Sequence, residues 1–231
     1  MADARWDDLE ASVVACRLCP RLVAWREETA RVKRRAFRDE DYWGRPVPGW
    51  GDRRSRVLVV GLAPAAHGGN RTGRIFTGDS SGDFLFGALH RAGFANQSLS
   101  RSRDDGLELT GVYIAAAARC APPDNKPLPA ELAACRPYLR GEIDLLDRLR
   151  VVVALGRIAY EAVLKVYAEA PGCASRATLL PQFAHAAAVT LGPGLPLVIT
   201  SYHPSRQNTQ TGRLTAEMFD RVWALARAAL A

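Results

Sequence analysis

Four short apolar runs along the chain predict buried strands. They are Val57–Val60, Val112–Ala116, Val151–Leu155 and Leu197–Thr200. Each run is rich in β-branched residues and lacks polar alternation, as expected of strands that are covered on both faces of a parallel sheet. Helical spacing of apolar positions marks the stretches between or after these runs, at Phe84–Ala92, Ala130–Arg148, Arg157–Ala170 and Thr215–Leu230. The alternation predicts a three-layer α/β/α sandwich around a mostly parallel sheet of about four strands.

The segment before the first strand has a different pattern. Residues 4–30 alternate acidic, apolar and basic groups at helical spacing, which predicts a helix on either side of "CRLCP". Pro20 is expected to open the second helix, since proline fits a first helical turn. Residues 31–56 are dense in charge, Pro, Gly and Trp, so we expect an irregular surface segment there, ordered by the aromatic side chains Tyr42, Trp43 and Trp50. The 231 residues suit a single domain that covers 1–231.

The charge and hydropathy of the chain indicate which kinds of molecule it can bind. The chain has 31 basic and 24 acidic residues, a formal net charge of +7, and this balance favours a polyanionic partner. No apolar run approaches the ~20 residues that a membrane-spanning helix needs. The N-terminus also lacks the basic-then-apolar pattern of a signal peptide. We therefore expect a cytoplasmic protein without a membrane partner.

The loops after the four predicted strands are the expected place for a binding site, because ligands of an open parallel sheet bind beyond its carboxyl edge. These loops read "GLAPAAHGGNRTGRIFTGD", "ARCAPPDNKP", "GRIAY" and "SYHPSRQNTQTGR". They contain neither a Walker A pattern nor G-x-G-x-x-G. Nucleotide hydrolysis and dinucleotide redox chemistry therefore lose their usual sequence support.

Four of the five cysteines have the spacing of a metal site. Cys16 and Cys19 form C-x2-C, and Cys120 and Cys135 follow about a hundred residues later. Structural disulfides are uncommon in a reducing compartment, and a tetrathiolate set holds either structural zinc or an iron–sulfur cluster. The spacing fits both metals, and the alternative is that Cys120 and Cys135 are ordinary buried thiols. Cys173 stands alone and is expected to be a small apolar side chain.

Several side chains in the strand-end loops are candidates for chemistry. His203 precedes a proline that restricts its direction, so it is either a positioned hydrogen-bond donor or general acid, or a turn residue. Phe76 is either a stacking platform for a base or an anchor to the core. Asp79 or Ser80 is placed to cap the helix that follows, and Asn125 to form a turn. The remaining histidines are expected to be structural: His67, His90 and His185.

Together and in this order, "GLAPA", "GRIFTGDSSG", "RCAPPDNKP" and "HPS" resemble the uracil-DNA glycosylase superfamily, over residues 16–213. The four cysteines match the branches of that superfamily that hold a [4Fe–4S] cluster. One such branch, family 4, has a glutamate in the first motif and an asparagine near the end of the second strand. This chain has Leu62, Ala65 and Ala116 at those places. It therefore resembles family 5, the type-B enzymes.

The resemblance implies an enzyme of DNA base-excision repair that acts on duplex DNA in the nucleoid as a monomer. It would flip a deaminated nucleotide out of the helix and hydrolyse its N-glycosidic bond through an oxocarbenium-like transition state. Phe76 would stack on the base and His203 would donate to uracil O2. The other assignments are Gly61, Ala63 and Ala116 for the base pocket, Ser205, Arg206, Gln207 and Asn208 for DNA, and Cys16, Cys19, Cys120 and Cys135 for a structural [4Fe–4S] cluster.

Two matters follow from the missing glutamate and asparagine. The water that attacks the sugar has no carboxylate in the first motif to activate it. The candidates to position this water are Asn70, Asp79 and Asn125. A small residue at position 116 removes a discriminating contact, so substrates beyond uracil, such as hypoxanthine, are expected. The alternatives are a uracil-only enzyme like family 4, a non-catalytic iron–sulfur DNA-binding module, and, without the resemblance, a zinc-containing α/β hydrolase.

Overall fold

The computed structural model of the protein describes residues 2–168 and 182–231. Its strands are β1 (Trp50–Gly51), β2 (Val57–Gly61), β3 (Val112–Ala116), β4 (Val151–Leu155), β5 (Ala188–Thr190) and β6 (Leu197–Ser201). Its α-helices are α1 (Ala2–Ala15), α2 (Pro20–Val32), α3 (Gly69–Thr72), α4 (Ser80–Arg91), α5 (Pro129–Leu145), α6 (Arg157–Tyr167), α7 (Arg206–Gln210) and α8 (Ala216–Ala228). Short 3-10 turns lie at η1 (Arg35–Phe37) and η2 (Pro123–Asn125). Cys173 falls outside the described residues.

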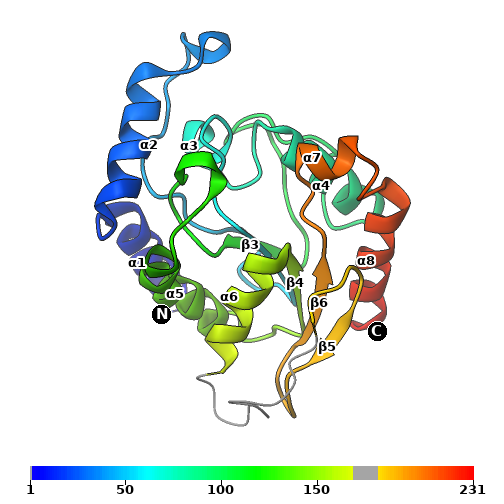
Figure 1. Ribbon diagram of the computed structural model, residues 1–231. Helices are drawn as coiled ribbons and strands as arrows, with labels where there is room; N and C mark the ends of the chain where they lie inside the picture. The colour runs from blue at the N-terminus through cyan, green and yellow to red at the C-terminus, as the bar shows by residue number, and fades with distance from the viewer. Residues whose placement is uncertain (1, 169–181) are drawn as a thin grey trace.

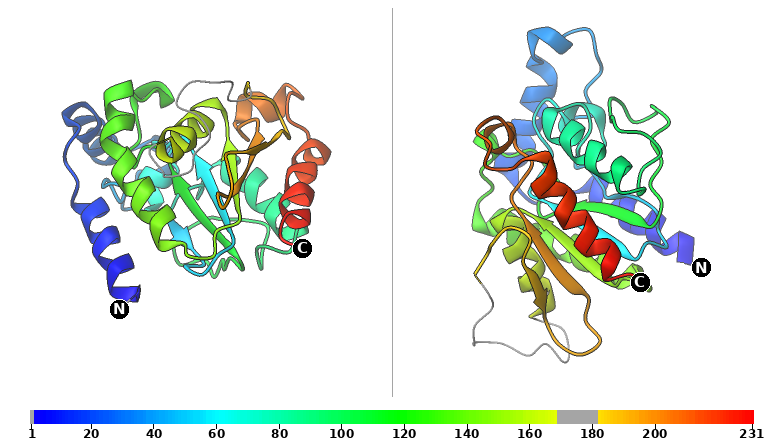
Figure 2. Two further views of the ribbon diagram at one scale, coloured as in Figure 1. Left: turned by 90° about the horizontal axis from the view of Figure 1, so that it is seen from below. Right: turned by 90° about the vertical axis from the view of Figure 1, so that its right-hand side faces the viewer.

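The strands form one sheet in the order β1-β3-β2-β4-β6-β5 (Figure 1). The four inner strands are parallel, and the two edge strands pair antiparallel to their neighbours. Alternate residues of the inner strands face opposite layers. Val57 and Val59 pack with α4 and α8, whereas Leu58 and Val60 pack with α5 and α6. The predicted α/β/α sandwich is therefore confirmed, with α1 beside α5 on the second face (Figure 2).

The sheet has six strands where the sequence predicted about four. The two additional strands are β1, of two residues, and β5, of three. Neither contains an apolar run, and β5 alternates exposed and buried positions. Edge strands of this kind form because an inner strand offers hydrogen bonds, which a local pattern does not reveal.

The segment 31–56 is only partly the irregular surface that was predicted. Its aromatic side chains do order it: Trp43 Nε1 donates to the carbonyl of Pro46 at 3.0 Å, and Trp50 Nε1 to that of Ile75 at 3.1 Å. Residues 46–49, however, are buried, and the Val47 N–H donates to the carbonyl of Arg119 at 2.7 Å. A stretch rich in Pro and Gly thus lies inside the protein because the loop after β3 supplies its hydrogen-bond partners.

Helix ends differ from the prediction by a few residues. The helix predicted from Phe84 begins at Ser80, since Asp79 caps it, and the helix after β4 ends at Tyr167. The two N-terminal helices are α1 and α2, and Pro20 opens the second as predicted. Among the described residues, no helix is long and apolar enough to cross a membrane.

Candidate active site

The carboxyl ends of the inner strands bring the sequence-predicted loops to one edge of the sheet. Gly61 at the end of β2 pairs in register with Ala116 at the end of β3, and Leu155 of β4 pairs with Ser201 of β6. Gly61 and Ala116 are buried, and Ala63 lies half-buried in the loop after β2. Segments more than a hundred residues apart in sequence therefore enclose the same site.

Phe76 lies against the end of β2 in a conformation that few side chains adopt. Its φ is +58°, in the left-handed region, and its side chain is only 8% exposed. A Cβ on Gly61 would stand 2.8 Å from the Phe76 ring, so glycine is required there for the ring to lie on the strand. Left-handed backbone at a bulky residue is unfavourable and persists only where the surroundings hold it.

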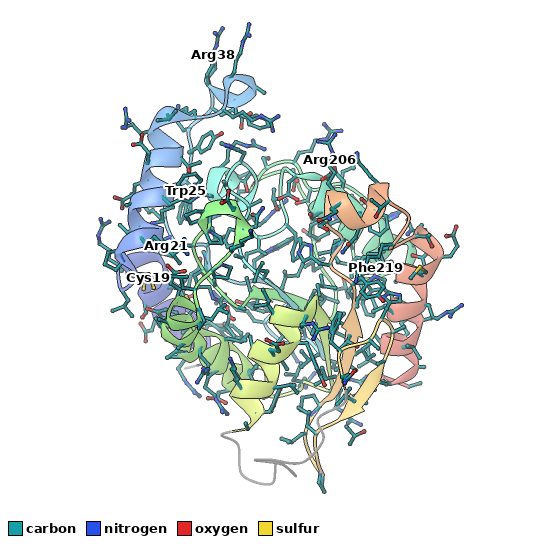
Figure 3. All side chains as sticks on the ribbon, viewed as in Figure 1. Cys19, Arg21, Trp25, Arg38, Arg206 and Phe219 are labelled. Carbon is teal, nitrogen blue, oxygen red and sulfur yellow. The ribbon has the colours of Figure 1, made fainter. Side chains whose placement is uncertain are left out.

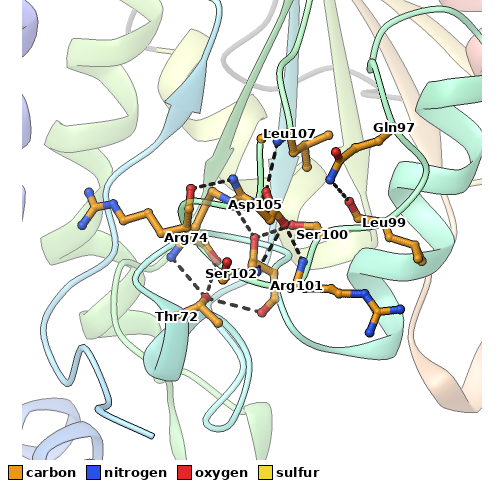
Figure 4. Close-up of polar contacts among 12 residues, drawn as sticks. Thr72, Arg74, Gln97, Leu99, Ser100, Arg101, Ser102, Asp105 and Leu107 are labelled. Atoms are coloured by element: carbon orange, nitrogen blue, oxygen red, sulfur yellow. Dashed lines mark hydrogen bonds and ion pairs between the residues drawn. The ribbon is translucent and has the colours of Figure 1, made fainter.

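The 97–107 loop supplies that support (Figure 4). Arg74 is buried and its guanidinium donates to both carboxylate oxygens of Asp105, at 2.7 and 2.8 Å, and to Ser100 Oγ at 2.9 Å. The Gly78 N–H donates to the carbonyl of Ser100 at 2.8 Å. Phe76 is therefore fixed from both sides of its own loop. The sequence analysis missed Arg74, Ser100 and Asp105, because these partners meet only in the tertiary structure.

His203 faces Phe76 from the loop after β6. The two ring centroids are 5.9 Å apart with 30° between the ring planes. On its other side His203 approaches Gly156, where an added Cβ would stand 3.3 Å from His203 Cβ. Asn208 Nδ2 donates to the carbonyl of His203 at 2.8 Å, and Ser205 Oγ accepts from the Asn208 N–H at 3.3 Å. These contacts hold the direction of the histidine.

The imidazole of His203 is neutral at physiological pH. Burial lowers its pKa to about 4 from the ordinary 6.5. No hydrogen bond from the described part of the chain engages either ring nitrogen. The side chain therefore presents a neutral, unengaged imidazole at the carboxyl edge of the sheet, beside the face of an aromatic ring.

The three candidates for positioning a water, Asp79, Asn70 and Asn125, differ in burial and in hydrogen bonding. Asp79 accepts hydrogen bonds from Ser81 and Gly82 N–H through one oxygen, at 3.0 Å each, while its second oxygen lies against Gly68. Burial raises the pKa of Asp79. Asn70 is fully buried and donates to the carbonyl of Arg26 at 3.2 Å. Asn125 is exposed, with φ +56°, at the end of η2.

The residues predicted to contact DNA form the short helix α7 and its cap. Arg206 and Gln207 are exposed, whereas Ser205 and Asn208 are half-buried and hold the histidine loop as described above.

The three histidines predicted to be structural lie outside the candidate site, two in contact with other side chains or backbone and one on the surface. His185 accepts from the Tyr202 N–H at 3.2 Å, His67 contacts Tyr42, and His90 is exposed on α4.

The four cysteines come from separate elements. Cys16 follows α1, Cys19 precedes α2, Cys120 follows β3 and Cys135 lies in α5, and none of them forms a disulfide. Burial, and then the neighbouring thiols, raise the pKa of Cys19; burial raises that of Cys120 to about 11. No three His, Cys, Asp or Glu side chains of the described ranges converge as a single metal ion requires.

The surroundings of these thiols fit an anionic thiolate group. Arg26, only 2% exposed, donates to Cys120 Sγ at 2.9 Å and to the carbonyl of Cys16 at 3.3 Å. The Arg119 N–H donates to Cys135. Other buried arginines are hydrogen-bonded to carboxylates, as Arg119 is to Glu142. Arg26 instead has sulfur as its buried partner, and its carboxylate contact, Glu27 Oε1 at 3.7 Å, is exposed. A further anion at the thiols would therefore compensate this buried charge.

Comparison with known proteins identifies the family of the chain. The family model described as the uracil DNA glycosylase superfamily matches residues 48–227. The chain belongs to this superfamily. It is 57% identical over 208 residues to the type-5 uracil-DNA glycosylase of Thermus thermophilus, covering 90% of each chain. It is 53% identical over 217 residues to the type-5 enzyme of Mycobacterium bovis, covering 94% of this chain and 78% of the relative.

A type-4 uracil-DNA glycosylase, that of Pyrobaculum aerophilum, is 35% identical over 121 residues, or 52% of this chain. The type-5 likeness thus extends over nearly the whole chain, and the type-4 likeness over half. This agrees with the apolar residues Leu62, Ala65 and Ala116, on which the prediction of family 5 rested.

Proposed function

We propose that this protein removes uracil from DNA by hydrolysing its N-glycosidic bond, leaving an abasic site for base-excision repair. One observation in the candidate site supports the proposal most strongly. A neutral His203, whose ring nitrogens have no hydrogen-bond partner among the described residues, faces Phe76 beside Gly61 at the carboxyl edge of the sheet. An aromatic face stacks on a flipped base, and a positioned donor stabilises the negative charge that develops as uracil departs as an anion.

The mechanism assigns a distinct task to each side chain. Phe76 stacks on the flipped base, and its supported loop keeps the ring in place. His203 donates a hydrogen bond to uracil O2, where negative charge develops as the bond to C1′ breaks. Because its imidazole is neutral, His203 acts as a fixed dipole and transfers no proton.

Asp79 is the carboxyl group best placed to orient the water. One oxygen is used by the helix cap, which fixes the side chain, and the second lies toward Gly68 in the loop after β2. Asn70 is fully buried and its Nδ2 donates to the carbonyl of Arg26, although its Oδ1 has no partner among the described residues, and Asn125 is exposed. A cationic sugar needs little activation of its nucleophile, so a carboxyl group that orients water suffices.

The cysteines are proposed to hold a structural [4Fe–4S] cluster. The donor set is Cys16, Cys19, Cys120 and Cys135, the four thiolates that a [4Fe–4S] cluster requires. When bound, it would tie the α1–α2 region to the loop after β3 and to α5. Arg26 would then compensate its negative charge and the Arg119 N–H would donate to one of its sulfurs.

The first experiment uses an end-labelled duplex with one uracil opposite guanine, followed by alkali. Strand cleavage at the uracil after incubation with the protein is the expected result. Tight binding of the duplex without cleavage would instead identify a non-catalytic DNA-binding module.

Substrate breadth gives a further prediction. Ala116 is small and buried beside Gly61, so no side chain here makes a discriminating contact with the base edge. We expect hypoxanthine to be released from an oligonucleotide as well as uracil. In Ala116→Asn, release of hypoxanthine relative to uracil should fall about tenfold or more, because a polar side chain in the pocket rejects bases that do not pair with it. Undetectable hypoxanthine release by the wild-type protein would contradict the prediction.

The pH dependence of excision tests the protonation state of His203. A histidine with an ordinary pKa near 6.5 would be only about one-tenth neutral at pH 5.5. Burial holds the pKa of His203 near 4, so its neutral form persists down to about pH 5. Single-turnover excision should therefore differ less than twofold between pH 7.5 and 5.5. A tenfold fall over this interval that persists in a His90→Ala control would show that His203 titrates normally.

A further inference from the structure

A basic protrusion rises beyond the carboxyl edge of the sheet. This protrusion, residues 33–41, is called here the basic arm; it connects α2 to Trp43, contains η1, and carries four basic and three acidic side chains. Figure 1 places it above α3, at the same end of the molecule as α7. Arg38 at its tip and Arg206 of α7 both point away from the sheet at that end (Figure 3). The candidate site lies at the edge between these two structures.

The arm presents three exposed guanidinium groups. Arg34, Arg35 and Arg38 are exposed and line one shallow surface hollow. Arg34 and Arg35 form no ion pair with any residue in 2–168 or 182–231. Arg38 approaches Asp39 at 3.6 Å, with both side chains exposed. Exposed pairs contribute little, so Arg38 can exchange Asp39 for a phosphate.

The arm is fastened to the active-site loop through Arg71. The Arg71 guanidinium lies 4.1 Å from the centroid of the Phe37 ring and forms an ion pair with Glu40, so it holds two positions of the arm. Its remaining hydrogen bonds go to the carbonyls of Gly78 at 3.1 Å and His67 at 2.9 Å, both in the loop after β2. The same arginine thus joins the arm to the residue that precedes Asp79.

A second connection lies at the base of the arm. Tyr42 Oη and His67 Nδ1 are hydrogen-bonded at 3.0 Å, and the Trp43 N–H donates to the carbonyl of Arg71 at 2.8 Å. The arm is therefore fixed relative to the loop that holds Phe76. Fixed side chains lose less conformational entropy when they bind a ligand than mobile ones do.

We propose that the basic arm is a second DNA-binding surface, which contacts backbone phosphates of the duplex on the side of the flipped nucleotide away from α7. This deepens the proposed function and rests on it. Guanidinium groups bind phosphate bidentately, and the arm bears three exposed arginines beside the site. A duplex laid across the carboxyl edge would contact α7 and the arm together, with the damaged nucleotide between them.

The test is the salt dependence of binding to an undamaged 24-base-pair duplex, measured by fluorescence anisotropy. In Arg34→Ala/Arg35→Ala/Arg38→Ala, the slope of log Kd against log salt should fall by about 2 to 3, because each lost phosphate contact removes about 0.9. The matched control is Arg54→Ala/Arg148→Ala/Arg150→Ala, three exposed arginines near the amino ends of β2 and β4. Its slope should stay near the wild-type value.

The possible results distinguish a DNA-binding role of the basic arm from the proposed excision of uracil. Single-turnover excision of uracil at saturating DNA should be unchanged in the arm variant, since the arm does not touch the base. A wild-type slope in an arm variant with an unchanged melting temperature would overturn the proposal, as would an equal loss in the control. If wild-type protein excises no uracil but the slopes differ as expected, the proposed reaction fails and the DNA-binding surface stands.

Discussion

Replacing His203 by alanine is expected to slow uracil excision by about 10²–10³-fold, the loss found when a single donor to a developing anion is removed. Among the described aromatic rings, only His203 lies in ring contact with Phe76. Duplex binding should change little, because the contacts of His203 arise only after the base has flipped. Single-turnover cleavage of the uracil duplex measures the rate, and anisotropy measures the binding.

Two controls make this result specific. His90→Ala removes an exposed histidine of α4 and should leave the rate unchanged. The melting temperature of His203→Ala should fall by only about 2–4 °C, because the ring loses its contact with Phe76 but no internal hydrogen bond. A rate within a few-fold of wild type would refute the assignment of His203 as the donor.

Replacing Cys120 by serine is expected to remove the cluster and destabilise the fold together. Cys120 is 6% exposed and accepts a hydrogen bond from the buried Arg26. Loss of the cluster would leave the buried Arg26 with only the exposed Glu27 carboxylate, at 3.7 Å, as its anion, and would separate α2 from the loop after β3. A destabilisation of about 3 kcal/mol would lower the melting temperature of a chain of this size by about 6–12 °C.

The measurements are visible absorbance, iron and sulfide content, and thermal unfolding. Cys173→Ser, which changes the remaining cysteine, should retain the absorbance and the wild-type melting temperature. A folded Cys120→Ser protein with unchanged stability and no iron would show that the cluster is dispensable for the fold. Zinc in place of iron in the wild-type protein would refute the proposed cofactor.

Much of this molecule was predictable from local patterns. The inner strands were evident because each is a continuous apolar run buried on both faces. The place of His203, Phe76 and Ala116 at one edge followed from the rule that parallel strands end together. The cap by Asp79 was also foreseeable, since an acidic residue before a helix satisfies free N–H groups.

The sequence by itself therefore determined the layered fold, the edge at which the loops meet, and the residue types available there, because these depend on periodicity and on chain direction. Only the tertiary structure decided the edge strands β1 and β5, the burial of residues 46–49, and the support of Phe76 by Arg74 and Asp105. It also decided that His203 is neutral and that Arg26 has sulfur as its buried partner. These features depend on which groups are desolvated together by segments distant in sequence, and burial of that kind leaves no periodic signal along the chain.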